Sequence, residues 1–177
     1  MRVVGGEHGG RRLAAPRGRS TRPTSERTRE AVFSMLGDIS GASVLDLFAG
    51  SGALGIEALS RGAAHATFVD SGRAAIIAIR RNLEQLGLVE SALITKLDVR
   101  ALPSLGETYD LVFVDPPYSQ ASALGPLLAR ELPARLTPGG RVVSESDRRT
   151  PLELGFPTIR ERRYGDTLIR IHQLPTK

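Results

Sequence analysis

The sequence predicts an α/β fold with a mostly parallel sheet, helices on both faces and a short N-terminal β-hairpin extension. Short apolar runs alternate with longer segments of helical spacing between residues 44 and 145, which is typical of parallel strands joined by helices. A glycine-rich turn follows the first run, at 49–55. Two further runs flank Tyr164-Gly165-Asp166, which resembles a hairpin turn and adds antiparallel strands at one edge.

The N-terminal part of the chain predicts, in order, a hairpin of residues 2–4 with 11–14, a loop over 15–24 and a helix over about 25–36. Thr24 or Ser25 can cap this helix, because a side-chain oxygen there accepts a backbone N–H of the first turn. Gly37 closes the helix.

The body is then predicted as seven strands with connecting helices. The strands are expected at 44–48, 66–69, 92–97, 111–114, 141–145, 158–163 and 167–173, and the helices near 53–61, 72–86 and 120–136. Only a weak connection containing Pro103 links the third strand to the fourth. The segment Pro138-Gly139-Gly140 predicts a turn into the fifth strand.

Length and charge divide the chain into a body and an arm. A chain of 177 residues fits one domain with a full core, here residues 25–177, plus an extension, residues 1–24. The formal net charge is +5, and residues 1–30 alone carry eight Arg against three Glu. A basic arm on a neutral body favours contact with a phosphate backbone. The alternative is a solvated tail.

Composition excludes several chemistries. There is no Cys, so neither a disulfide nor a thiolate nucleophile is available, and methylation at carbon 5 of a pyrimidine is not expected. The three His residues are scattered, so no metal site is predicted. No apolar stretch approaches the ~20 residues that span a bilayer. The N-terminus lacks an apolar signal region, so we expect a cytoplasmic protein.

A cofactor-binding turn is predicted directly after the first body strand. Gly50, Gly52 and Gly55 spell G-x-G-x-x-G in a strand–turn–helix context, where glycine lets a ligand approach the backbone and the helix N-terminus. Asp70 ends the next strand, twenty residues after Gly50, where a carboxylate can accept ribose hydroxyls. The alternative for Asp70 is a helix cap.

Four acids indicate which cofactor this turn binds. Asp46, Asp70, Asp98 and Asp115 fall at or near the carboxyl ends of successive strands, and these ends line one crevice in an open α/β sheet. Four carboxylates would repel the pyrophosphate of a dinucleotide. They would tolerate the ammonium and sulfonium groups of S-adenosylmethionine, with Asp98 accepting the adenine amino group and Asp46 near the amino-acid end.

A target-binding segment follows the fourth strand and reads Asp115-Pro116-Pro117-Tyr118. The Asp115 carboxylate can accept a hydrogen bond from an exocyclic amine of a nucleobase. The fixed φ of Pro116 helps to hold a carbonyl outward as a second acceptor. Tyr118 offers a flat face on which a flipped base can stack. The alternative is an ordinary turn after a strand.

These motifs resemble the Rossmann-like S-adenosylmethionine-dependent methyltransferases that act on amino groups of nucleobases, and more closely the RsmD family. The closer resemblance lies in four N-terminal pieces and one C-terminal piece: Arg2-Val3-Val4-Gly5-Gly6, Gly10-Arg11-Arg12-Leu13, Arg22-Pro23-Thr24, Arg27-Thr28-Arg29-Glu30-Ala31-Val32-Phe33 and Arg163-Tyr164-Gly165-Asp166-Thr167. The family's pattern departs at Glu7-His8-Gly9, so the RNA contacts of that loop do not transfer.

The resemblance implies a 16S ribosomal RNA guanine-N2 methyltransferase that modifies a loop guanine of the small subunit or its assembly intermediate. It implies that S-adenosylmethionine binds to Asp46, Phe48, Ala49, Gly50, Ser51, Gly52, Gly55, Asp70, Ser71, Asp98 and Val99. The target base would bind to Asp115, Pro116, Pro117 and Tyr118. The expected RNA-binding residues are Arg2, Arg11, Arg12, Arg19 and Arg22 of the arm and Arg27 directly after it. A monomer is the default expectation.

Three other functions stay open at this stage. A DNA methyltransferase acting on adenine N6 or cytosine N4 would use the same residues 115–118, although 177 residues leave no room for a separate target-recognition domain. A nicotinamide-dependent oxidoreductase shares the glycine turn but is opposed by the four acids. An inactive RNA-binding assembly factor is opposed by the intact cofactor and target motifs.

Overall fold

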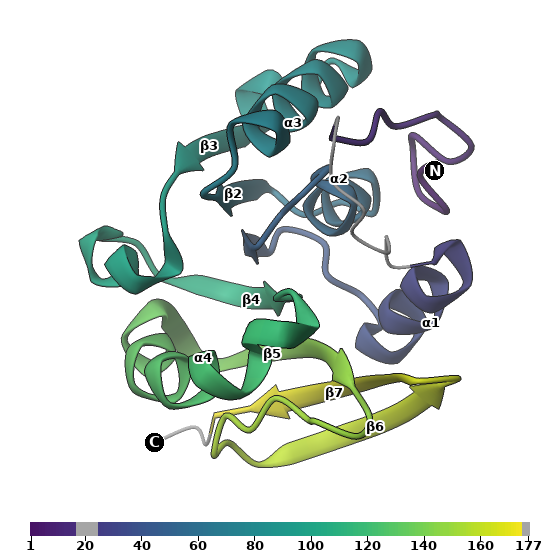
Figure 1. The fold of residues 1–177 in the computed structure, drawn as a ribbon. Helices are drawn as coiled ribbons and strands as arrows, with labels where there is room; N and C mark the ends of the chain where they lie inside the picture. The colour runs from purple at the N-terminus through teal and green to yellow at the C-terminus, as the bar shows by residue number, and fades with distance from the viewer. Residues whose placement is uncertain (17–24, 175–177) are drawn as a thin grey trace.

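The computed structural model describes residues 1–16 and 25–174 and contains a seven-stranded sheet in the order β3-β2-β1-β4-β5-β7-β6 (Figure 1). The strands are β1 (Ser43–Leu47), β2 (His65–Asp70), β3 (Ala92–Lys96), β4 (Tyr109–Val114), β5 (Leu136–Asp147), β6 (Thr158–Tyr164) and β7 (Thr167–Gln173). β1 to β5 pair in parallel, while β7 runs antiparallel to both β5 and β6. The α/β prediction with a terminal antiparallel hairpin is therefore confirmed.

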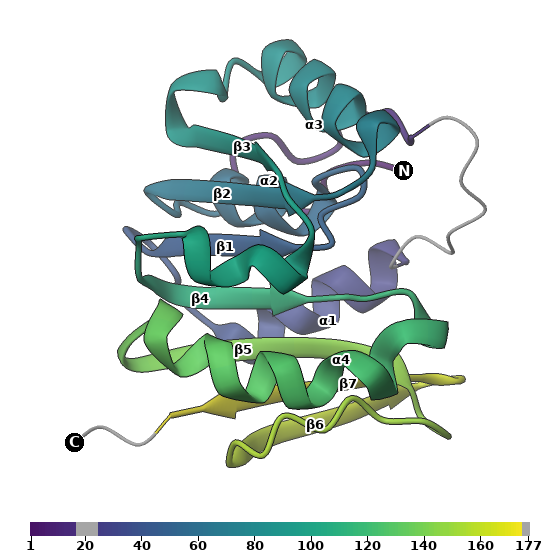
Figure 2. The ribbon, with the colours of Figure 1, turned by 60° about the vertical axis from the view of Figure 1, so that its left-hand side comes forward.

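Helices cover both faces of the sheet (Figure 2). The α-helices are α1 (Glu26–Leu36), α2 (Ala53–Ser60), α3 (Arg73–Leu86) and α4 (Tyr118–Glu131), with short 3-10 helices at Val89–Ser91, Val99–Ser104 and Leu132–Arg135. One core cluster packs α1, α2 and α3 against the sheet, and a second packs α4 and the 3-10 helices Val99–Ser104 and Leu132–Arg135 against the other face. No helix in the described ranges is long and apolar enough to cross a membrane.

Helix α1 begins and ends where its capping residues predict. The Ser25 hydroxyl accepts the Thr28 N–H at 3.0 Å, which satisfies a donor of the first turn. Gly37 follows the last residue with φ +72°, and its N–H donates to the Phe33 carbonyl. Val32, Phe33 and Leu36 form the buried face of the helix.

The region between β4 and β5 differs from the prediction. α4 ends at Glu131, and a 3-10 helix with Pro133 in its first turn replaces the expected helical residues up to 136. β5 begins at Leu136, earlier than predicted, so the expected turn at 138–140 lies within it. The pairing register with β4 shifts between Tyr109 and Leu111, which shows that the glycines there accommodate an irregularity rather than end the strand.

The strand order places a topological switch point between β1 and β4. The chain runs from β1 through β2 to β3 on one side and then returns to pair β4 with the other side of β1. Leu47 pairs with Val114, so Phe48 and Asp115 follow at the same edge of the sheet. In open α/β folds ligands bind outside the strand ends at such a point.

The N-terminal segment packs onto the body. Arg2 and Arg12 form an antiparallel bridge, which agrees with the expected hairpin. Val3 and Leu13 are buried in the core cluster that contains α1, α2 and α3. The backbone of Ala14 is held by Asn82 of α3, which donates to its carbonyl and accepts its N–H.

Candidate active site

A cavity of about 650 Å³ opens at the carboxyl ends of β1, β2, β4 and β5. Nearly all the predicted cofactor residues line it: Asp46, Phe48, Ala49, Gly50, Ser51, Asp70, Ser71, Asp98 and Val99. The predicted target residues Asp115, Pro116, Pro117 and Tyr118 line the same cavity. The fold thus brings both motifs to one space, although they lie far apart in the sequence.

Gly52 and Gly55 do not line the cavity but shape the turn beneath it. Gly52 precedes α2 with φ +78°, a conformation that favours glycine. A Cβ on Gly55 would lie 2.3 Å from Phe68 Cε1, so glycine allows α2 to pack closely on β2. Phe48 adopts φ +61°, a strained conformation for a bulky residue, where the chain leaves β1.

Asp46 is a buried carboxylate that fixes the start of α2. Its Oδ2 accepts the Gly55 N–H at 2.9 Å, and its side chain is almost wholly shielded from solvent. Burial raises the pKa of Asp46 well above its usual value, and the charges of Asp115 and Asp70 raise it further. A cation bound nearby would relieve this cost, because it stabilises the ionised form.

Asp70 joins the two turns that follow β1 and β2. Its Oδ2 accepts the Gly50 N–H at 3.0 Å, and its Oδ1 accepts the Gly72 N–H at 2.7 Å. A carboxylate oxygen can accept more than one hydrogen bond, so these contacts are compatible with ligand hydroxyls. Asp70 therefore holds the two turns and also lines the cavity. The two alternatives considered for it in the sequence, a ligand-binding residue and a helix cap, do not exclude each other.

Asp98 lies at the rim of the cavity. It caps the 3-10 helix Val99–Ser104 by accepting the Arg100 N–H at 2.9 Å. The Arg100 Nη1 also lies 3.0 Å from Asp98 Oδ2, and both side chains are about half exposed or more. An adenine amino group bound to Asp98 would share the carboxylate with Arg100. The Asp98–Arg100 ion pair lies at the surface and contributes little to stability, so it does not block such a contact.

The target segment forms the start of α4. Pro117 is the N-cap residue, and its carbonyl accepts the Gln120 N–H at 2.8 Å. The hydroxyls of Tyr118 and Thr167 lie 3.2 Å apart, so the outer end of the ring is held by the first residue of β7. Burial raises the pKa of the Tyr118 phenol, with a smaller contribution from the charges of nearby carboxylates. The ring therefore stays neutral at physiological pH.

Sequence reasoning missed further acids at this end of the cavity, namely Glu145, Asp147 and Asp166. Ser144 of β5 pairs with Val114 of β4, so Glu145 and Asp115 follow side by side at the strand ends. Glu145 also ended the predicted fifth strand, so the rule that marked the other four acids could have found it. The target end of the cavity is thus strongly acidic.

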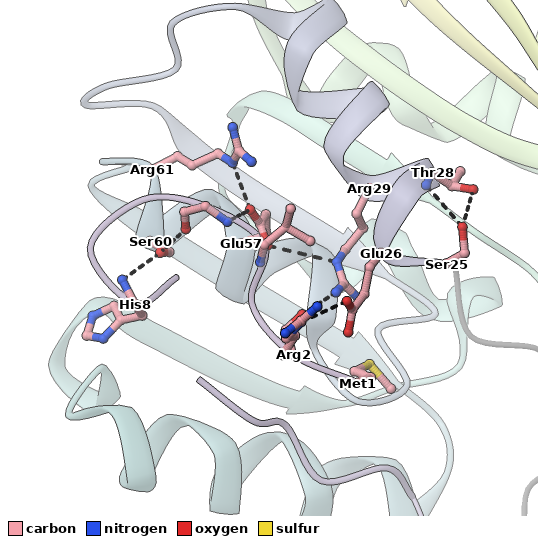
Figure 3. A network of polar contacts seen from close by, with 12 residues as sticks. Met1, Arg2, His8, Ser25, Glu26, Thr28, Arg29, Glu57, Ser60 and Arg61 are labelled. Carbon is pink, nitrogen blue, oxygen red and sulfur yellow. Dashed lines mark hydrogen bonds and ion pairs between the residues drawn. The ribbon is translucent and has the colours of Figure 1, made fainter. Parts of the chain in front are cut away.

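A buried polar network anchors the N-terminal segment beside the site (Figure 3). Glu57 of α2 is fully buried and accepts the N–H groups of Val4 and Gly5 at 2.7 and 2.8 Å. Its carboxylate also accepts from Arg61 Nε at 2.8 Å. Arg29 Nε lies 3.9 Å from it. No sequence motif marked Glu57, because its partners become neighbours only in the folded chain.

The predicted RNA-binding arginines differ in their surroundings. Arg11, Arg12 and Arg27 are exposed. Arg2 is also exposed but pairs with Glu26 at 2.9 Å. Arg19 and Arg22 lie outside the described residues. None of these four described arginines lines the cavity, and their contact with RNA stays a prediction.

Comparisons with known proteins agree with these features. The family model described as conserved hypothetical protein 95 matches residues 1–173. The chain is 38% identical to "Putative rRNA methyltransferase YlbH" of Bacillus subtilis, over 98% of both chains. It is 34% identical to "Ribosomal RNA small subunit methyltransferase D" of Escherichia coli K12, over 98% of this chain and 89% of that protein.

A solved structure gives the same result for the fold. The chain is similar to "Putative methyltransferase yhhF" from Escherichia coli, with a TM-score of 0.85 and 33% identity over 100% of this chain and 99% of that one. The family model and the relatives each cover nearly the whole chain. This chain therefore belongs to the conserved hypothetical protein 95 family, the RsmD family that its motifs resemble.

Proposed function

We propose that this protein transfers a methyl group from S-adenosylmethionine to the exocyclic N2 amine of a guanine in 16S ribosomal RNA. The observation that carries the proposal is that one cavity joins a glycine turn with Asp70 at one end to Asp115 and Tyr118 at the other. Methyl transfer needs donor and acceptor in one space. The names of the relatives support ribosomal RNA as the substrate class.

The lining of the cavity fits S-adenosylmethionine. Ala49, Gly50 and Ser51 have small side chains, which lets a ligand approach the backbone of the turn. Asp46, with its raised pKa, favours a ligand that brings positive charge. The ammonium and sulfonium groups of this cofactor supply that charge, whereas the pyrophosphate of a nicotinamide dinucleotide would add repulsion.

The chain's own residues would orient the target amine. The amino lone pair of guanine is delocalised into the ring, so the nitrogen is a poor nucleophile. In the proposed mechanism the Asp115 carboxylate and the Pro116 carbonyl accept its N–H groups, which favours a tetrahedral nitrogen in line with the donor. When bound, S-adenosylmethionine supplies an activated methyl group. The proton then leaves through Asp115 or water, and no strong general base is required.

Tyr118 would hold the plane of the base. Its hydroxyl is tied to Thr167, so the ring has a fixed position at the start of α4. Stacking a base on such a ring contributes ~1–3 kcal/mol. The same contact selects a flipped or looped-out base, since a base within a duplex cannot reach the cavity.

The arm would supply the RNA contacts. Arg11, Arg12 and Arg27 are exposed on the described part of the N-terminal region. Exposed arginines bind phosphates and fix the register of RNA without reading its sequence. We propose that this arm, residues 1–24, binds the small ribosomal subunit or its assembly intermediate, with the protein acting as a monomer in the cytoplasm.

The experiment separates cofactor binding from turnover. Purified wild type and Asp115→Ala are titrated with S-adenosylmethionine and assayed on undermethylated small subunits. We expect the variant to bind the cofactor nearly normally and to lose methyl transfer. The matched control is Glu90→Ala, because Glu90 is exposed and precedes β3 at the opposite edge of the sheet. Near wild-type turnover by Asp115→Ala would overturn the mechanism.

A further inference from the structure

We infer that Arg29 forms the binding subsite for the α-carboxylate of the amino-acid part of S-adenosylmethionine. This inference rests on the proposed function, and it assigns a binding role to a residue that the motifs placed only within an N-terminal helix. Arg29 lies on α1, outside the strand-end turns that carry the predicted cofactor residues.

The first observation is an incompletely satisfied buried cation. Arg29 is fully buried, yet it lines the cavity. Its Nη2 donates to the Arg2 carbonyl, whereas Nε and Nη1 have no hydrogen-bond partner among the described residues. A buried guanidinium without acceptors costs free energy, because its lost hydration is not replaced. A bound anion would replace it.

Glu57 does not satisfy this guanidinium. Its nearest oxygen lies 3.9 Å from Arg29 Nε, beyond hydrogen-bond distance. The Glu57 carboxylate is already bonded to Arg61 and to the N–H groups of Val4 and Gly5. Glu57 therefore balances the charge of Arg29 without accepting a hydrogen bond from it, and Nε and Nη1 keep no acceptor among the described residues.

The second observation is the position of Arg29 beside the glycine turn. Figure 3 shows the Arg29 side chain reaching from α1 toward Arg2. Met1 Sδ accepts a hydrogen bond from Ser51 Oγ, which lies within the turn, at 3.4 Å. Arg29, Met1 and Ser51 all line the cavity, so this contact links the N-terminal segment beside Arg29 to the glycine turn.

The third observation is charge complementarity. Among the described residues, Arg29 and Arg100 provide the basic side chains that line the cavity, and Arg100 pairs with Asp98 at the rim. The acids match the two cationic groups of S-adenosylmethionine. Its single anionic group needs a buried cation, and Arg29 supplies one with hydrogen-bond geometry suited to a carboxylate. An RNA phosphate fits this position less well, because a phosphate that is part of a polymer backbone cannot enter the cavity far enough to reach a fully buried side chain.

The test compares two ligands that differ in this carboxylate alone. S-adenosylmethionine and its decarboxylated analogue, which keeps both cationic groups, are titrated calorimetrically into the wild type, Arg29→Met and Arg100→Met. We expect the wild type to prefer S-adenosylmethionine by about tenfold or more, as lost hydrogen bonds to a charged group predict. Arg29→Met should bind both ligands nearly equally, while Arg100→Met keeps the preference.

Equal affinities in the wild type would overturn the inference without any variant, so it stays testable even if Arg29→Met does not fold. A preference that persists in folded Arg29→Met, as judged by circular dichroism, would also overturn it. If Arg29→Met weakened RNA binding and left the ligand preference intact, the guanidinium would instead serve a phosphate. Failure of both ligands to bind the wild type would refute the proposed function as well.

Discussion

Replacing Glu57 by Ala tests how the N-terminal segment is held beside the site. This fully buried carboxylate accepts hydrogen bonds from the N–H groups of Val4 and Gly5 and from Arg61 Nε, and it lies near the buried Arg29. The substitution leaves the Arg29 charge buried without an anion and removes the acceptor of two backbone donors.

The structure gives the magnitude. Leaving a buried charge without the opposite charge beside it costs about 3–5 kcal/mol. The unpaired N–H groups do not add their full cost, because water can enter the space left by the side chain. We therefore expect a loss of about 3–5 kcal/mol in the free energy of unfolding. For a chain of this size each 1 kcal/mol corresponds to about 2–4 °C in Tm.

Urea denaturation and thermal unfolding, each followed by circular dichroism, measure this loss. The matched control is Glu84→Ala, because Glu84 is an exposed glutamate on helix α3 and its replacement should change stability by less than about 0.5 kcal/mol. Limited proteolysis should also cut within the first 16 residues of Glu57→Ala sooner than in the control. A loss below about 1 kcal/mol would refute the reasoning that Glu57 is the anchor.

Three further predictions concern the site and the arm. Tyr118→Ala should lower kcat/KM on RNA by about 5- to 150-fold, the equivalent of one stacking contact, whereas Tyr118→Phe keeps the ring and most of the activity; equal losses in steady-state assays would contradict stacking. The double variant Arg11→Gln/Arg12→Gln should weaken RNA binding, and the slope of log affinity against log salt concentration should become shallower by about 1–2. Cofactor affinity, measured by calorimetry, should not change. An unchanged slope would show that these arginines do not contact the RNA. Because the pKa of Asp46 is raised and a cationic ligand favours its ionised form, affinity for S-adenosylmethionine should fall as pH is lowered through that raised value. Asp46→Asn should bind S-adenosylmethionine more weakly and lose this pH dependence. If calorimetry showed the same pH dependence of affinity in Asp46→Asn as in the wild type, another group would be the one that titrates.

Most of the fold could be predicted because the central strands β1, β2 and β4 are buried on both faces. The run 111–114 is wholly apolar, the run 44–47 is apolar except for the buried Asp46, and glycines mark where their connections turn. The boundaries near 131–141 were predicted less well. The predicted helix ran through Pro133, where the chain instead forms a 3-10 helix. The segment 138–140 reads as a turn in sequence, but pairing with β4 carries β5 through it.

The site was predicted where local sequence determines it. Asp70 and Asp115 follow apolar strands, so their place at the sheet edge could be inferred from order alone. Arg29 could not be distinguished in this way, since it is one of eight arginines in a basic region. Its burial depends on Arg2 and Glu57, which approach only when the N-terminal segment packs between α1 and α2.

The identity of the methylated nucleoside tests the central claim most directly. Purified protein is incubated with labelled S-adenosylmethionine and undermethylated small ribosomal subunits, and the digested RNA is mapped by mass spectrometry. We predict N2-methylguanosine at a single position of 16S ribosomal RNA. Label on duplex DNA and none on subunits or free 16S RNA would contradict this account in favour of a DNA amino-methyltransferase, and no label on any substrate would leave an inactive RNA-binding factor.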